Sequence, residues 1–349
     1  MFYSLARAAL FSLDPEVAHD LTLKKLDRVA ALGIPRLLFR RADDLPVQAM
    51  GLSFRNPVGL AAGMDKNAAH VDALGTLGFG HIEAGTVTPL PQPGNPKPRI
   101  FRLIPAQGVI NRMGFNNEGV ERFVANVRRQ PRFRAAGGIL GLNIGKNAAT
   151  PLERALDDYL AALRAVYAHA DYVAVNISSP NTKDLRALQG ERELQALLAG
   201  LAAARRALED EHGRRVPLAV KIAPDLADAA IAPLADLLVA NGVDGVIATN
   251  TTIARDRVRG LAHADEAGGL SGRPLRERAT EVVRLLAGHL QGRLPIIASG
   301  GVMSGADALE KVQAGATLVQ IYTGFIYSGP DLIVDCVDAL RAHFAAHGG

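Results

Sequence analysis

The sequence predicts an α/β protein, a (β/α)8 TIM barrel preceded by a two-helix N-terminal extension. Eight short apolar runs alternate with amphipathic helical patterns along most of the 349 residues. A strand followed by a helix, eight times over, is typical of a closed parallel barrel rather than an open sheet. Such a barrel needs about 250 residues, which leaves room for an extension and for loop insertions. We therefore expect a helical hairpin at residues 1–45 and a barrel at residues 46–349.

The first 45 residues predict two amphipathic helices. Apolar side chains recur at helical spacing from Phe2 to Leu13, and Asp14 with Pro15 forms an N-cap followed by proline at the first helical position. Gly33 can end the second helix. Basic residues fringe both helices, so the pair could lie on a membrane surface. From the residues alone we prefer the commoner role of such helices, which is to cover the main domain.

The barrel elements follow in order from Pro46. The expected strands are 57–62, 81–87, 139–144, 172–177, 218–222, 246–250, 295–298 and 318–322. The expected helices lie near 66–77, 117–129, 152–168, 191–211, 227–240, 274–290, 304–313 and 331–346. Residues 89–115 form a long insertion after the second strand, and insertions of that length on the catalytic face are usually functional.

Composition narrows the function classes. The net charge is only +4 and no basic block occurs, which disfavours nucleic acid but allows an anionic ligand. Cys336 is the only cysteine, so neither an intramolecular disulfide nor a thiolate metal cluster is expected, and the scattered histidines predict no metal site. No apolar stretch is long enough to span a bilayer and no secretory signal is evident. We therefore expect a location in the cytosol or on the inner face of a membrane.

Small polar residues gather where the expected strands end, as in Ser178–Thr182 after the fourth strand. Barrel enzymes place their chemistry at this end. Amide side chains both donate and accept, so several asparagines there suit a planar ligand with carbonyl and imide groups. Lys221 lies inside an apolar strand, where its charge is costly unless an anion meets it. Gly300-Gly301 and Thr323-Gly324, after the last two strands, favour a phosphorylated ligand.

A set of motifs runs in order through most of the barrel: Asn56–Lys66, Gly85–Pro89, Gln92–Gly94, Asn111–Asn116, Asn143–Lys146, Asn176–Thr182, Ala219–Asp225, Ala248–Thr251 and Gly268–Gly272. Together with the N-terminal hairpin, this set resembles the class 2, quinone-dependent dihydroorotate dehydrogenase family. The closing segment, Ile297–Gly301, matches more loosely, since Ala298 and Ser299 stand at positions expected to vary.

The resemblance implies oxidation of (S)-dihydroorotate to orotate in de novo pyrimidine (UMP) biosynthesis. Electrons would pass through tightly bound FMN to a membrane quinone, in a peripheral protein on the cytoplasmic face of the cell membrane. It implies that Ser179 is the catalytic base, that Lys221 stabilises negative charge on the flavin, and that Lys66 bridges cofactor and substrate carboxylate. As a hypothesis, residues 1–45 would shape an apolar tunnel for the quinone.

The resemblance also implies two sets of binding residues. The FMN set is Ala62, Gly63, Met64, Asp65, Lys66, Thr86, Asn143, Asn176, Lys221, Thr249, Gly272, Gly301, Tyr322 and Thr323. The substrate set is Lys66, Asn111, Arg112, Met113, Gly114, Phe115, Asn176, Asn181, Asn250 and Thr251.

Three alternatives stay open. Class 1 relatives resemble this barrel but use a cysteine as base and pass electrons to fumarate or NAD, and Cys336 in the last helix is poorly placed for that role. A non-redox, phosphate-binding barrel would explain Gly301 and Thr323 but not Lys221. A peripheral membrane-binding module without enzymatic activity would explain residues 1–45 only.

Overall fold

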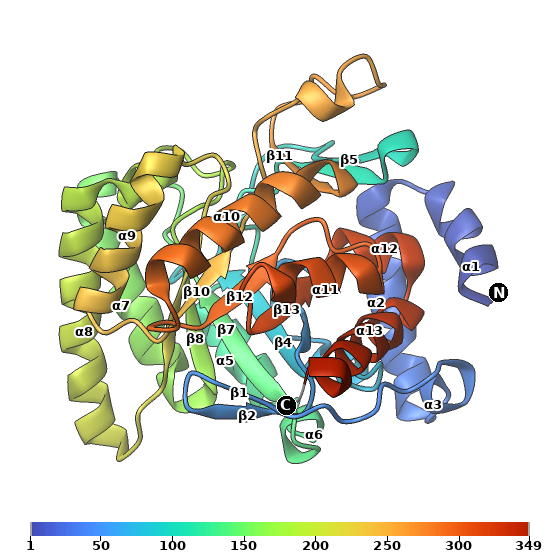
Figure 1. Ribbon diagram of the computed structural model, residues 1–349, viewed down its shortest axis with the longest axis horizontal. Helices are drawn as coiled ribbons and strands as arrows, with labels where there is room; N and C mark the ends of the chain where they lie inside the picture. The colour runs from blue at the N-terminus through green and yellow to red at the C-terminus, as the bar shows by residue number, and fades with distance from the viewer. Residues whose placement is uncertain (1, 348–349) are drawn as a thin grey trace.

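Eight parallel strands form a closed barrel at the centre of the protein, as the sequence predicts (Figure 1). The structure is a computed structural model that describes residues 2–347. Neighbouring strands follow chain order, and the last pairs with the first. The strands are β3 (Val58–Leu60), β4 (His81–Val87), β7 (Ile139–Ile144), β8 (Tyr172–Asn176), β9 (Leu218–Ile222), β10 (Gly245–Ala248), β12 (Ile296–Ser299) and β13 (Leu318–Ile321).

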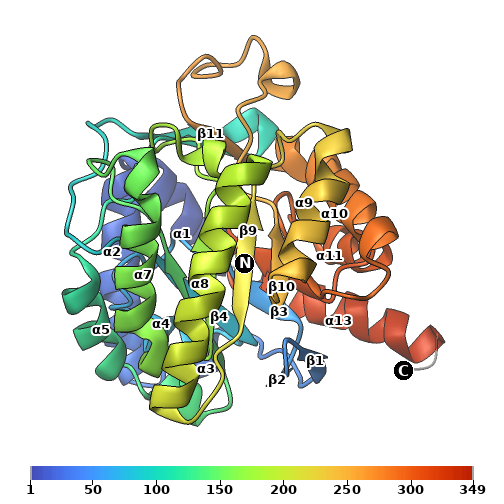
Figure 2. The same ribbon diagram turned by 90° about the vertical axis from the view of Figure 1, so that its left-hand side faces the viewer.

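Helices surround the barrel, as Figures 1 and 2 show. The apolar face of each helix packs against the strands. They are α4 (Val71–Gly75), α5 (Val120–Arg128), α7 (Ala155–Val166), α8 (Glu191–His212), α9 (Asp228–Ala240), α10 (Arg276–Leu290), α11 (Gly305–Gln313) and α13 (Asp331–His347). Two short helices, α6 (Arg132–Ala135) and α12 (Thr323–Ser328), were not predicted separately. The helix α4 is shorter than expected, because the Asp65 carboxylate accepts from the N–H groups of Ala69 and His70 and holds that stretch in turns.

A short β-hairpin that was not predicted covers the end of the barrel where the strands begin. It consists of β1 (Val47–Ala49) and β2 (Leu52–Phe54). The Phe54 ring makes an edge contact with the His81 ring at the start of β4, at a centroid distance of 5.4 Å. Phe54 also packs in one cluster with the inward side chains Tyr172, Ile247 and Ile297. This end of the barrel is therefore a packed apolar core.

The insertion after β4 builds a second small sheet over the opposite end. It contains β5 (Ile100–Leu103) and β6 (Gly108–Asn111), and β6 also pairs with β11 (Gly269–Gly272), which follows β10 in the chain. Figure 1 shows this antiparallel sheet above the barrel, beside the loop that leads into β11. The insertion is thus a folded cap rather than an open loop.

The N-terminal helices lie against one side of the barrel. They are α1 (Phe2–Phe11) and α2 (Pro15–Ala31), and a third, unpredicted turn, α3 (Pro35–Leu38), begins at a proline. The Asp14 carboxylate caps α2 as expected, accepting from the N–H groups of Glu16 and Val17 at 2.9 and 3.1 Å. The Tyr3 hydroxyl donates to the carbonyl of Ile326 at 2.6 Å, which fastens α1 to α12.

The second N-terminal helix is tied to the cap sheet by a largely buried ion pair. Arg99 makes two hydrogen bonds to the Glu16 carboxylate, at 2.7 and 3.2 Å, and Lys97 lies 3.3 Å from the same group. The N-terminal segment therefore packs on the barrel and on its cap at once.

Candidate active site

A cavity that is partly open to solvent lies between the carboxyl ends of the strands and the cap sheet. Lys66 and Lys221 are the charged side chains in its wall. Among the described residues that line it, none is His, Asp, Glu or Cys. A cavity with two cations, no carboxylate and many amide and hydroxyl groups suits an anionic ligand rich in hydrogen-bonding atoms.

Most of the predicted site residues meet in this cavity. Those in its wall are Ala62, Gly63, Lys66, Thr86, Asn111, Met113, Gly114, Phe115, Asn176, Ser179, Asn181, Lys221, Thr249, Asn250, Thr251, Gly272, Gly301, Tyr322 and Thr323. They come from β-strand ends and from the segment after β6, which are far apart in the chain. The closure of the barrel brings them together.

Four predicted site residues lie outside the cavity wall. The Met64 side chain packs in the barrel core, and the Asp65 carboxylate bonds to backbone N–H groups of its own turn. Asn143 lies behind Thr86, whose hydroxyl donates to its side-chain oxygen. Arg112 points elsewhere: it bonds to Glu266 at 2.6 Å, and its guanidinium stacks 4.6 Å from the centre of the Phe101 ring. Phe101 of the cap sheet and Glu266, in the loop before β11, therefore hold the Arg112 guanidinium.

A chain of hydrogen bonds connects the polar groups of successive strands. The Thr86 hydroxyl donates to Asn143 at 2.6 Å and accepts from Asn176 at 3.0 Å. Asn250 then donates to the side-chain oxygens of Asn176 and Ser178, at 3.2 and 3.1 Å. Because each amide is fixed by its neighbours, these side chains present preset donors and acceptors to a ligand.

Ser179 follows β8 and is 6% exposed. Its hydroxyl oxygen accepts from the backbone N–H of Asn181 at 3.2 Å, and the Asn181 amide donates to Asn111 at 3.2 Å. The loop that carries Ser179 is therefore joined to the end of β6 on the cap. The Ser179 side chain also lines the cavity.

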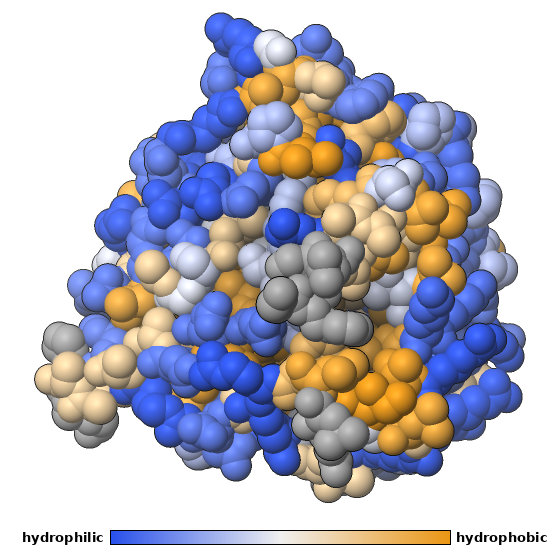
Figure 3. All heavy atoms as spheres, turned by 90° about the vertical axis from the view of Figure 1, so that its right-hand side faces the viewer, coloured by the Kyte–Doolittle hydropathy of each residue, from blue (hydrophilic) through white to orange (hydrophobic). Residues whose placement is uncertain are grey.

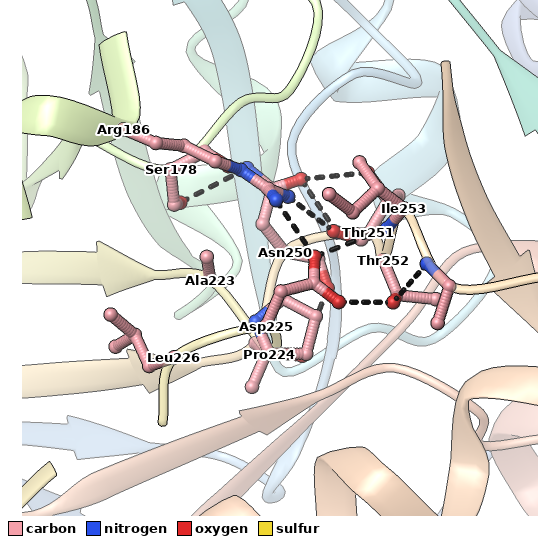
Figure 4. A network of polar contacts seen from close by, with 12 residues as sticks. Ser178, Arg186, Ala223, Pro224, Asp225, Leu226, Asn250, Thr251, Thr252 and Ile253 are labelled. Carbon is pink, nitrogen blue, oxygen red and sulfur yellow. Dashed lines mark hydrogen bonds and ion pairs between the residues drawn. The ribbon is translucent and has the colours of Figure 1, made fainter. Parts of the chain in front are cut away.

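An arginine that sequence reasoning missed fastens the Ser179 loop to two other strand ends (Figure 4). Arg186 donates to the carbonyls of Ser178 and Thr251, at 3.0 and 2.8 Å, and to the Asp225 carboxylate at 2.7 Å. The Thr252 hydroxyl also donates to Asp225. A guanidinium can make the three bonds of Arg186 in one plane. The signal in the sequence was the presence of Arg186 and Asp225 close behind two polar strand ends.

Glu83 is a second residue that sequence reasoning missed. It lies in the middle of β4 and is fully buried. Its carboxylate is 3.5 Å from the Lys221 ammonium, which lines the cavity from β9. A carboxylate inside an apolar strand is as unusual as a lysine there, and these two unusual positions in the sequence could have predicted the Glu83–Lys221 ion pair.

Two groups of the cavity wall, Lys66 and Tyr322, have pKa values changed by burial. The pKa of Lys66 is lowered to about 8, mainly by burial; the nearby Glu16 opposes this shift and Arg99 adds to it, so Lys66 is still mostly charged at pH 7. Burial raises the pKa of Tyr322 to about 12, so its hydroxyl stays protonated. Tyr322 is therefore no base, while Lys66 remains a cation for an anionic ligand.

Two glycines shape the wall after the last strands. Gly272 and Gly301 both have positive φ, 88° and 77°. A Cβ at Gly301 would lie 2.2 Å from the Cα of Arg276, and one at Gly272 would lie 2.3 Å from the carbonyl oxygen of Gln107. Glycine is required at both positions, and it leaves backbone atoms exposed to the cavity.

With this geometry established, the comparisons with known proteins identify the family. A sequence model described as dihydroorotate dehydrogenase matches residues 44–344. The chain belongs to the dihydroorotate dehydrogenase family. It is 60% identical over 338 residues to the dihydroorotate dehydrogenase (quinone) of Bordetella parapertussis, covering 97% of each chain. It is 59% identical to the protein of the same name from Chromobacterium violaceum, covering 99% of each.

Solved structures of the family agree with this fold. The crystal structure of DHODH from Eimeria tenella in complex with ferulenol has a TM-score of 0.87 and 39% sequence identity, and the match covers 96% of this chain and 93% of that one. The ligand-free form of the same protein also gives a TM-score of 0.87, at 40% identity and 96% coverage of each chain. This dihydroorotate dehydrogenase family member is therefore a TIM-barrel oxidoreductase.

Proposed function

We propose that this protein oxidises (S)-dihydroorotate to orotate in de novo pyrimidine biosynthesis and passes the electrons to a membrane quinone. One observation carries the proposal. The chain is about 60% identical, over nearly its full length, to relatives named dihydroorotate dehydrogenase (quinone), and the charged groups of its strand-end cavity are two lysines. An anionic ligand with ring carbonyl and N–H groups fits that wall.

FMN is the cofactor that fits the same cavity. The wall offers exposed glycine backbone at Gly272 and Gly301 for a phosphate, and a buried acceptor, Gln320 Oε1, that has no hydrogen-bond partner. A ring N–H of the cofactor would satisfy such an acceptor. When bound, FMN supplies a two-electron acceptor for the substrate and a donor for the quinone.

The residues that would hold FMN come from most of the strand ends. They are Ala62, Gly63, Lys66, Thr86, Asn176, Lys221, Thr249, Gly272, Gly301, Tyr322 and Thr323. Asn143 supports Thr86 from behind, and Met64 and Asp65 act through the turn after β3, where the Asp65 carbonyl accepts from Gly85 N–H at 2.9 Å.

The substrate is held beside Ser179. The Lys66 ammonium pairs with its carboxylate, and the amides of Asn111, Asn176, Asn181 and Asn250, with the Thr251 hydroxyl, hold the ring. Met113, Gly114 and Phe115 close the cavity above it and exclude water. Arg112 is no longer proposed as a substrate ligand, because its charge is already paired with Glu266.

Ser179 takes up the proton that leaves the substrate ring. No His, Asp, Glu or Cys is among the described residues of the cavity wall, so Ser179 is the side chain best placed for this transfer. A hydroxyl is a weak base at neutral pH, and it must pass its own proton onward as the new bond forms. The N–H of Asn181, which donates to the serine oxygen, leaves the hydroxyl proton free to move toward solvent.

The N-terminal segment, residues 1–45, provides quinone access and peripheral contact with the cytoplasmic face of the cell membrane. His19 on α2 lies near the backbone of Met64, beside the cavity-lining Gly63. Exposed apolar side chains follow the same segment: Leu13, Val17, Leu32 and Leu38. Figure 3 faces this side of the molecule and shows hydrophobic surface gathered there. Within residues 2–347, no helix has the length and apolarity needed to cross a membrane.

The deciding experiment assays dihydroorotate oxidation with three competing acceptors, a quinone, fumarate and NAD, using the purified protein. We expect a yellow protein with flavin absorbance that reduces the quinone far faster than the other two. Preference for fumarate or NAD would indicate the class 1 activity. A colourless protein that cannot be loaded with FMN would indicate a non-redox barrel.

A further inference from the structure

Glu83 lies at the centre of a buried polar network beneath the cavity. Asn143 donates to one carboxylate oxygen at 2.7 Å, while Tyr172 and Gln320 donate to the other at 3.0 and 2.8 Å. The Lys221 ammonium is 3.5 Å from the first oxygen. These five residues belong to five strands, β4, β7, β8, β9 and β13. The network therefore spans the barrel interior.

Two members of the network face the cavity and the carboxylate does not. Lys221 and Gln320 line the cavity, whereas Glu83 and Tyr172 lie below it. Lys221 is 5% exposed, so little water reaches its ammonium. Glu83 approaches Lys221 from the core side and leaves the opposite side of the ammonium directed at the cavity.

Glu83 and Lys221 form the ion pair of this region. Burial lowers the pKa of His81, two residues before Glu83 in β4, to about 4, so that imidazole is neutral. Burial and the nearby carboxylate raise the pKa of Tyr172 well above its usual value, so its hydroxyl stays protonated. A buried ion costs several kcal/mol unless it is paired and hydrogen-bonded. Each of the two ions therefore offsets the free-energy cost of burying the other.

We propose that Glu83 is a positioning residue that fixes the Lys221 ammonium at the cavity floor and keeps it charged. A fixed cation at that place stabilises the negative charge that a flavin gains when it accepts electrons. The proposal rests on the proposed function, because it assumes FMN in the cavity. It assigns to Glu83 an effect that reaches the cofactor only through Lys221.

The test uses the Glu83→Gln variant, which keeps the shape of the side chain and removes its charge. Lys221 is then a buried cation without a partner, and it loses its proton as the pH rises. We expect flavin reduction by dihydroorotate in a single turnover to fall by roughly 10- to 100-fold at pH 8 and to recover toward pH 6. We also expect the midpoint potential of bound FMN to become more negative than in the wild type as the pH rises. That potential is measured by equilibration with a redox dye, without substrate.

Two further variants separate positioning from a plain structural role. Tyr172→Phe removes one hydrogen bond to the same carboxylate but keeps its charge, and we expect the wild-type pH dependence. Glu83→Asp also keeps the charge, and we expect a slower reaction with a wild-type pH dependence. If the Glu83→Gln protein does not bind FMN, the Glu83→Asp protein is used for the test. A pH profile of flavin reduction shifted to lower pH in that variant would overturn the proposal.

A double-mutant comparison tests whether Glu83 acts through Lys221. Lys221→Met alone should slow flavin reduction strongly, and adding Glu83→Gln should change that rate by less than about threefold. Fully multiplicative effects, or a Glu83→Gln protein with the wild-type potential at every pH, would overturn the inference. Failure of the wild type to oxidise dihydroorotate would instead overturn the proposed function, because the dye-based potential does not depend on the substrate.

Discussion

At the scale of single residues, the cavity combines two cations with neutral groups that are already hydrogen-bonded to one another. Lys66 and Lys221 supply the charge, and Ser179 supplies a hydroxyl among amides. Catalytic chemistry in such a wall depends on where a few groups are held rather than on one strongly basic side chain. Substitutions at Ser179 and at the arginine that fixes its loop should therefore have separable effects.

We expect Ser179→Ala to keep FMN and to bind orotate while flavin reduction by dihydroorotate nearly stops. Ser179→Cys should retain more activity than the alanine variant, since a thiol with a pKa of about 8.5 forms a thiolate base as the pH rises. Rapid mixing that follows flavin bleaching over a range of pH provides the measurement. Equal rates for the wild type and Ser179→Ala would place the base elsewhere.

Arg186→Lys keeps the charge opposite Asp225 but cannot bond two carbonyls and a carboxylate in one plane. We expect flavin reduction to slow by about tenfold or more, because the loop that carries Ser179 loses its fixed position. Melting temperature and FMN content should change little. Arg154→Lys is the matched control, since Arg154 is exposed and bonds only Asp157 three residues on. Similar rates for both variants would show that Arg186 has no positioning role.

At the scale of elements, the barrel strands pack so closely that glycine is needed inside them. Gly141 lies in β7, and a Cβ added there would be 2.1 Å from the Tyr172 ring on β8. That contact leaves no room for a methyl group unless the ring moves, and the Tyr172 hydroxyl holds the ring to Glu83. The inward faces of neighbouring strands thus constrain each other's side-chain size.

We expect Gly141→Ala to destabilise the fold by about 1–3 kcal/mol through overpacking. Gly288 in α10 is the control, because an added Cβ meets no atom within 4 Å. Gly288→Ala should be neutral or stabilising by up to about 1 kcal/mol, since glycine is a poor helix former. Urea unfolding of the FMN-loaded proteins measures both. Equal midpoints for the two variants would contradict the packing argument.

At the scale of the whole molecule, the two halves of the proposed reaction belong to different regions. The residues around Ser179 come from the barrel and its cap, whereas none of the described residues 2–45 lines the cavity. The N-terminal helices are nevertheless bound to the barrel through Arg99, Glu16 and Tyr3. Substrate oxidation and quinone reduction should therefore respond to different changes.

We expect deletion of residues 1–40 to spare single-turnover reduction of FMN by dihydroorotate. It should abolish reoxidation by a long-tail quinone and binding to anionic vesicles, and the vesicle binding of the full chain should weaken with salt. The deletion exposes apolar barrel surface, so its solubility is checked first. If the truncated protein is soluble and still reduces quinone at the full-length rate, the segment serves only as a structural cover.

Val17→Glu tests the membrane contact without removing the segment. Val17 is 55% exposed on α2, and a carboxylate there should weaken binding to anionic vesicles while FMN reduction is unchanged. Leu285→Glu on α10 is the matched control, because that leucine is exposed on a different helix. Equal loss of vesicle binding in both variants would indicate a general charge effect rather than a defined contact surface.

The sequence by itself determined the order and position of the barrel elements. Strands such as β4, β7 and β9 begin and end where the apolar runs do, and Asp14 caps α2 as predicted. These features are local, because periodicity and capping depend on residues a few positions apart. Family motifs around Asn176 and Lys221 were readable for the same reason.

Only the tertiary structure decided which polar groups meet. The pairing of β6 with β11, the capture of Arg112 by Glu266, the placement of Arg186 across three strand ends and the burial of Glu83 beneath Lys221 all join distant parts of the chain. No local pattern specifies such partners, since a buried charge or an open strand edge is satisfied by whatever group the closed barrel brings beside it.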